Sequence, residues 1–136
     1  MSPDEIERVQ QSFAVLAEPD RLARVFYDRL FAAVPETRAL FPTDLGTQRQ
    51  KLAEQLAVIV GALDDTAAVV ATTRELGRRH GGYGTRVGHY DAVGEALVAA
   101  VVACSPEGRL DEPTQQAWRR AYRLVAESMM QGAAEG

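Results

Sequence analysis

The stretch Gln48–Leu63, QRQKLAEQLAVIVGAL, decides the fold class of this chain. Its apolar residues recur at spacings of three and four, which places them on one face of an α-helix. These residues are Leu52, Leu56, Ile59, Val60 and Leu63. No run of alternating β-branched residues bounded by hairpin turns occurs in the sequence. We therefore expect an all-α protein.

The same period predicts further helices on both sides of this stretch. The first begins after Ser2, where Pro3 and Glu5 complete the pattern of a capping box. Others are expected to begin near Pro19 and to span about 67–80, 90–103 and 113–131, with a short helical piece over 35–41. Because no linker, repeat or low-complexity segment divides the chain, we expect one domain over 1–136 whose last residues, 132–136, fray.

Composition argues against several classes of protein. The 136 residues include 15 basic and 19 acidic side chains, and this acidic balance disfavours binding to nucleic acid. The single cysteine, Cys104, cannot form an intramolecular disulfide. No apolar run approaches the roughly 20 residues of a membrane span, and the N-terminus lacks the pattern of a secretory signal. We therefore expect a cytoplasmic protein with no membrane partner.

Two histidines, His80 and His89, flank a glycine-rich segment and are the most informative polar residues. Helical spacing places His80 on the apolar face of its helix, in line with Thr73. A lone histidine on such a face is more often a packed core residue than a ligand. Imidazole is also a common axial ligand of haem iron, and such a site would need polar donors on its other side. The residues alone leave both interpretations open.

Tyr27 and Gln48 are candidates for those donors. Tyr27 stands between apolar neighbours in the stretch Phe26–Phe31, so its ring either turns inward, with a hydroxyl that needs a partner, or lies at the boundary with water. Gln48 lies one turn before Leu52 on the face that we expect to be buried. Each feature is a weak signal by itself.

Taken in order along the chain, these features resemble a globin. The resemblance is closest to the globin domain of bacterial flavohaemoglobins and their single-domain relatives, and it covers nearly the whole chain. It rests on Phe26–Phe31 (FYDRLF), Arg38–Phe41 (RALF), Gln48–Leu52 (QRQKL), Arg79–His80, His89–Gly94 (HYDAVG) and Ala117–Tyr122 (AWRRAY). Since the first helix has its full length, the resemblance implies a complete three-over-three helical sandwich around a haem.

The resemblance also implies the cofactor and its neighbours. The cofactor would be haem b with His80 as the iron ligand, and Tyr27 and Gln48 would hydrogen-bond iron-bound dioxygen. The residues expected to line the haem are Phe41, Leu52, Leu76, Tyr90 and Tyr122, although core packing explains Tyr122 equally well. Candidates for pairing with the haem propionates are Arg78, Arg79 and Arg86, and a solvated basic edge is the alternative for these residues.

The chain departs from the family pattern in two places. A glutamate that family members carry near the end of the last helix aligns with Ala133, and the loss of this acceptor disfavours both peroxidase-like chemistry and fully efficient dioxygenase chemistry. The flavin- and NADH-binding domains of flavohaemoglobins do not follow, so we expect any turnover to use a separate reductase.

These implications lead to two functional hypotheses. The first is reversible dioxygen binding at a five-coordinate iron, serving oxygen transport or, with an external reductase, the conversion of nitric oxide to nitrate. The alternative is a sensor or interaction module, with or without haem, that performs no turnover.

Overall fold

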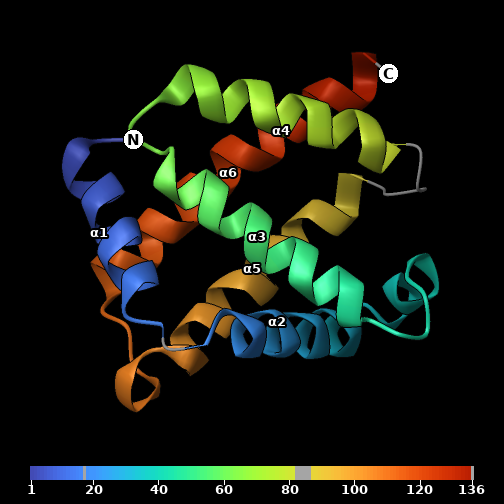
Figure 1. Ribbon diagram of the computed structural model, residues 1–136, viewed down its shortest axis with the longest axis horizontal. Helices are drawn as coiled ribbons and strands as arrows, with labels where there is room; N and C mark the ends of the chain where they lie inside the picture. The colour runs from blue at the N-terminus through green and yellow to red at the C-terminus, as the bar shows by residue number, and fades with distance from the viewer. Residues whose placement is uncertain (17, 82–86, 136) are drawn as a thin grey trace.

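The computed structural model describes residues 1–16, 18–81 and 87–135, and it describes only the backbone of residues 19, 79–81, 87, 88, 133 and 135. Within the described residues all regular structure is helical (Figure 1), which confirms the predicted all-α class. The elements are α1 (Pro3–Ala14), α2 (Pro19–Ala33), η1 (Pro35–Leu40), α3 (Gly46–Gly61), α4 (Thr66–Gly81), α5 (Val87–Cys104), η2 (Pro106–Gly108) and α6 (Glu112–Glu135), where η denotes a 3-10 helix.

The start of α1 shows the predicted capping box. The Ser2 hydroxyl accepts a hydrogen bond from the Glu5 N–H at 3.2 Å, and the Glu5 carboxylate accepts one from the Ser2 N–H at 3.0 Å. Arg120 of α6 lies 3.0 Å from the same carboxylate. The hydrogen bonds from Ser2 and the charge of Arg120 hold the pKa of Glu5 below its usual value. The cap therefore both begins α1 and ties it to α6.

Two helix boundaries differ from the prediction. α5 begins at Val87 instead of Tyr90, so His89 lies inside the helix and not ahead of it. α6 continues to Glu135, past the predicted end near Gln131. In both places a glycine had suggested a break, because glycine lowers helix stability in isolation.

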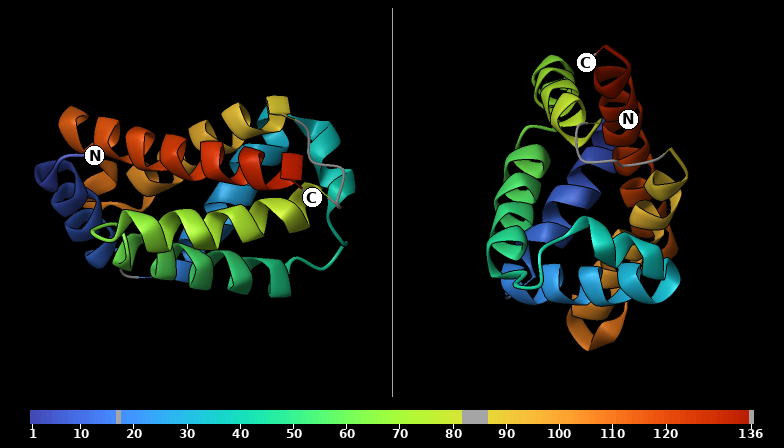
Figure 2. Two further views of the ribbon diagram at one scale, coloured as in Figure 1. Left: turned by 90° about the horizontal axis from the view of Figure 1, so that it is seen from above. Right: turned by 90° about the vertical axis from the view of Figure 1, so that its right-hand side faces the viewer.

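The helices form two layers. Figure 2 shows α3 and α4 on one side of the molecule and α5 and α6 on the other. α1 and η1 lie at opposite ends, and α2 runs along the lower edge in Figure 1. None of the helices in the described part of the chain is both long and apolar enough to cross a membrane.

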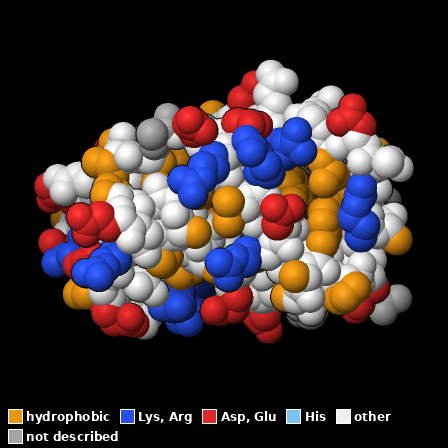
Figure 3. All heavy atoms as spheres, turned by 90° about the horizontal axis from the view of Figure 1, so that it is seen from below, with side chains coloured by type: hydrophobic (Ala, Val, Ile, Leu, Met, Phe, Trp, Pro, Cys, Tyr) orange, Lys and Arg blue, Asp and Glu red, His pale blue; other side chains and the backbone are white. Residues whose placement is uncertain are grey.

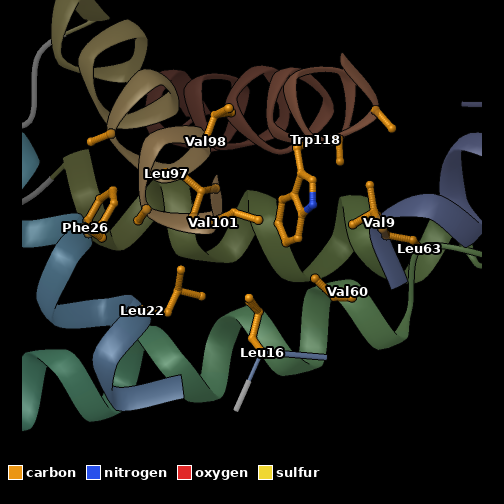
Figure 4. Packing of buried hydrophobic residues seen from close by; sticks show 14 of the residues in the cluster. Val9, Leu16, Leu22, Phe26, Val60, Leu63, Leu97, Val98, Val101 and Trp118 are labelled. Carbon is orange, nitrogen blue, oxygen red and sulfur yellow. The ribbon is translucent and has the colours of Figure 1, made fainter. Parts of the chain in front are cut away.

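Trp118 of α6 lies at the centre of the core (Figure 4). Only 2% of this residue is exposed, and its indole N–H donates a hydrogen bond to the Ser12 hydroxyl of α1 at 2.8 Å. Ser12 in turn donates to the carbonyl of Val9 at 2.9 Å, so the buried polar groups satisfy each other. The apolar side chains that share this core include Val9, Leu16, Leu22, Phe26, Val60, Leu63, Leu97, Val98 and Val101.

The surface carries charges of both signs. On the lower face of the molecule, acidic and basic side chains are interspersed with hydrophobic ones (Figure 3). Exposed ion pairs such as Arg8 with Asp4 at 3.0 Å and Arg24 with Asp20 at 3.2 Å join neighbouring turns of a helix. Exposed pairs of this kind contribute little to stability because solvent screens their charges.

Candidate functional site

Tyr27 lies in the middle of α2 within a cluster of aromatic rings. Only 6% of the residue is exposed, so the inward orientation is the one that the protein adopts. Its ring stacks on Phe31, one turn further along α2, with centroids 5.7 Å apart, and meets the edge of Phe41 at 5.4 Å. η1 brings Phe41 back to α2 after the chain turns at Pro35. The structure thus brings together Tyr27 and Phe41, two of the residues predicted for the site.

The Tyr27 hydroxyl has no hydrogen-bond acceptor among the groups that the structure describes. Burial raises the pKa of Tyr27 from its usual value near 10 to about 12. The hydroxyl therefore stays protonated at physiological pH and is available as a donor. A phenol donor in an aromatic cluster that has no acceptor among the described groups is available to a bound molecule that supplies one.

Gln48 and Leu52 lie one turn apart near the start of α3, and both are half-buried. Leu52 packs against the core, as do Phe41 before α3 and Leu56 one turn later, yet each keeps part of its surface uncovered. α3 packs mainly on α2, whereas α4 packs mainly on α6. In the described residues these two consecutive helices share no extensive contact, although only the turn at 62–65 joins them.

Leu76 of α4 is half-buried as well. Partly covered apolar side chains are therefore present on both helices that diverge, together with a buried phenol donor and an amide. Apolar side chains together with phenol and amide donors are the residue types that bind an apolar group carrying a polar ligand.

The first turn of α5 is tied to α6 through two tyrosines. The Tyr122 hydroxyl donates a hydrogen bond to the backbone carbonyl of Tyr90, which is itself only 8% exposed. Gly94 makes room for the Tyr122 ring, because a Cβ atom there would lie 2.6 Å from the ring. Burial raises the pKa of both tyrosines. Tyr122 therefore has a packing role in the structure, and the prediction that it also faces a cofactor stays a prediction.

α4 lies directly against α6, backbone to backbone. A Cβ atom at Gly77 would lie 1.9 Å from the carbonyl oxygen of Met129, and one at Gly132 would lie 2.0 Å from that of Arg74. The contact is reciprocal, since each glycine meets the residue three positions before the other. Sequence reasoning missed this contact, for which glycines inside helical patterns were the available signal.

The last turn of α4 carries Arg79 and His80, and the described residues do not include their side chains. The assignment of His80 as iron ligand and of Arg79 to the cofactor therefore stays a prediction. Arg86 lies outside the described residues altogether, and the Ala133 side chain is not described. Arg78 is exposed and lies 3.3 Å from Glu75.

The fold and the site define a class: an all-α protein of two helical layers with a tyrosine buried in an aromatic cluster between α2 and the residue that follows η1. The family model for globins matches residues 24–129, and the chain belongs to the globin family. This confirms the predicted fold and resemblance.

Curated relatives point to a more specific group. The flavohemoprotein of Bordetella pertussis is 31% identical over 134 residues, which cover 96% of this chain and 33% of the relative. The flavohemoprotein of Bacillus subtilis is 26% identical over 129 residues, which cover 92% of this chain and 32% of the relative. The chain thus spans about a third of the length of these relatives, and the match concerns their globin part.

Solved structures agree with this assignment. An engineered carbene transferase from Rhodothermus marinus, described as a candidate nitric oxide dioxygenase, superposes with a TM-score of 0.86 at 28% identity, over 99% of this chain and 94% of that one. A bacterial globin from Campylobacter jejuni has a TM-score of 0.85 at 21% identity, over 98% and 97% of the two chains. The second comparison shows the shared fold alone.

Proposed function

We propose that this chain binds haem b and, through it, dioxygen, and that it reacts with nitric oxide when an electron donor is present. The observation that carries the proposal is Tyr27, whose ring is buried among aromatic rings and whose protonated hydroxyl has no acceptor among the described groups. Membership of the globin family and similarity to flavohaemoproteins support it.

His80, on the last turn of α4, would hold the iron, and Tyr90 and Tyr122 would lie on the same side of the haem. Phe41, Leu52 and Leu76 would cover the porphyrin with apolar surface, and Arg79 would pair with a propionate. When bound, the haem supplies a reducible iron with an open position for a diatomic gas.

Tyr27 and Gln48 would decide which gas is held. A phenol and an amide that donate hydrogen bonds in a dry pocket stabilise a ligand with partial negative charge, and dioxygen acquires more negative charge than carbon monoxide does. Because the pKa of Tyr27 is about 12, its proton stays on the oxygen throughout the physiological range.

The relatives favour a nitric oxide dioxygenase over a simple oxygen carrier. Several are flavohaemoproteins, and the Rhodothermus marinus relative is described as a candidate nitric oxide dioxygenase. In such a role the globin needs electrons after each turnover, and we propose that a separate reductase delivers them.

The test is to mix the oxygenated protein with nitric oxide and to measure nitrate formed per haem, first alone and then with a flavin reductase and NADH. We expect one nitrate per haem alone and continuous nitrate production with the reductase. Stoichiometric nitrate with no turnover would favour an oxygen carrier. Absence of nitrate in both arms would contradict the proposal and favour the sensor hypothesis.

A further inference from the structure

The side chain of Arg38, in η1, is hydrogen-bonded to the backbone of the segment that follows it, residues 41–43. Its guanidinium donates hydrogen bonds to three successive backbone carbonyls. These are Phe41 at 3.3 Å and Pro42 at 2.9 Å, both from Nη1, and Thr43 at 2.9 Å from Nη2. Hydrogen bonds from a charged donor are about twice as strong as neutral ones, and the planar guanidinium presents its N–H groups to several acceptors in fixed directions.

The same guanidinium lies on the aromatic cluster. Its Cζ atom is 5.2 Å from the centroid of the Phe31 ring, within the range of a cation–π contact. Phe31 stacks on Tyr27, and Phe31 and Phe41 have centroids 5.7 Å apart. One side chain therefore contacts both the backbone that carries Phe41 and the ring on which Tyr27 lies.

Residues 41–43, which Arg38 holds, lie shortly before the start of α3. Beyond Thr43, the Asp44 carboxylate accepts a hydrogen bond from the Gly46 N–H at 2.9 Å, where α3 begins. Gln48 follows on the first turn of that helix. The Phe41 N–H also donates to the Arg38 carbonyl at 3.2 Å, so Arg38 holds Phe41 through both its backbone and its side chain. The side chain adds the contacts to Pro42 and Thr43, through which the chain reaches the start of α3.

We propose that Arg38 is a positioning residue of the gas-binding pocket: it holds Phe41 against Tyr27 and so fixes where the Tyr27 hydroxyl lies. This inference rests on the proposed function for its consequence, since the hydroxyl matters only if a ligand accepts its hydrogen bond. Neither composition nor helical period assigns Arg38 any role, because its contacts are made by a segment without regular structure.

The test compares Arg38→Ala and Arg38→Lys with Arg24→Ala. Lysine keeps the positive charge but lacks the planar guanidinium. Arg24 is an exposed arginine on α2, and its removal changes the net charge by the same amount. The first readout needs no haem. In the protein as purified, two quantities are measured: hydrogen exchange of the Phe41 and Gly46 amides, whose N–H groups are hydrogen-bonded, and nuclear Overhauser contacts between the Tyr27 and Phe41 rings.

We expect exchange to be about tenfold faster in both Arg38 variants and the ring contacts to weaken, which corresponds to the loss of about one charge-assisted hydrogen bond. Arg24→Ala should leave both measurements unchanged. If Arg38→Ala matches the wild type in exchange and in ring contacts, the Arg38 side chain does not hold the segment, and the proposal is overturned.

The second readout uses the haem-bound protein. Dissociation of dioxygen should be about tenfold faster in both Arg38 variants, while dissociation of carbon monoxide, which profits little from the Tyr27 donor, should stay within about twofold. Equal acceleration of both gases would mean a general loss of structure and would overturn the positioning role. If the wild type binds no haem, the proposed function fails, whereas the first readout still decides whether Arg38 holds Phe41 against Tyr27.

Discussion

The ring of Tyr27 is buried, and no described group accepts a hydrogen bond from its hydroxyl. Replacing it by phenylalanine keeps the ring contacts with Phe31 and Phe41 and removes only this hydroxyl. We expect the free energy of unfolding without a gas ligand to change by less than about 1 kcal/mol, because no internal hydrogen bond is lost. Dissociation of dioxygen should accelerate by roughly 10- to 100-fold, measured by stopped-flow after oxygen is removed. A loss of several kcal/mol of stability in Tyr27→Phe would show that the hydroxyl is satisfied inside the protein.

The raised pKa of Tyr27 predicts that the folded protein loses stability at high pH. The pKa of Tyr27 is raised to about 12 in the folded state, whereas the unfolded chain releases the proton near pH 10. The contribution of neutral Tyr27 is therefore complete below pH 10 and is lost as the pH rises from 10 toward 12, by about 2 kcal/mol at most.

Thermal unfolding of the wild type and of Tyr27→Phe between pH 9 and pH 11.5 checks this expectation. Burial also raises the pKa of Tyr90 and Tyr122, so the informative quantity is the difference between the two proteins. Tm should fall less steeply with pH in Tyr27→Phe, and parallel curves would contradict a raised pKa at Tyr27.

At the scale of the helices, the crossing of α4 and α6 depends on two glycines. In Gly77→Ala the new methyl group would lie 1.9 Å from the Met129 carbonyl oxygen, and neither backbone can move without displacing its helix. We expect a loss of roughly 2–4 kcal/mol in the free energy of unfolding by urea, with weaker haem binding because α4 carries His80.

Gly61→Ala is the matched control. Gly61 also lies in a helix, at the end of α3, but nothing lies within 4 Å of a Cβ atom built there. Alanine at this position should leave stability unchanged or raise it by up to about 1 kcal/mol. Similar losses in the two variants would mean that the close approach of α4 to α6 is not what makes glycine necessary at position 77.

The sequence predicted the helices well because burial of one face imposes a period that can be counted, as in Gln48–Leu63. It failed where glycine has a packing role. The sequence predicts a helix end at Gly132, yet α6 runs through this residue, which faces α4 at close range. The aromatic pair Tyr27 and Phe41 was predicted for the site by resemblance, and the structure places the two rings together. Arg38 could not be predicted, because its three acceptors are carbonyls whose positions follow from the fold of a turn.

The whole molecule is expected to be less stable without its cofactor. Phe41, Leu52 and Leu76 are only partly covered, and a porphyrin would remove further apolar surface from water. A ligand that binds only the folded state stabilises it by about 4 kcal/mol when its concentration exceeds the dissociation constant a thousandfold. Calorimetry before and after addition of haem should therefore show a large rise in Tm, and an unchanged Tm would argue that the chain folds without need of a cofactor.

The most direct test of the central claim is the visible absorption spectrum of the chain titrated with haem, recorded for the wild type, His80→Ala and His89→Ala. His89 is the matched control, because it is the only other histidine in the sequence and lies on the first turn of α5. We expect a Soret band that saturates at one haem per chain in the wild type and in His89→Ala, and a lost or strongly altered spectrum in His80→Ala. No Soret band in the wild type, or a spectrum that survives in His80→Ala and disappears in His89→Ala, would contradict the account.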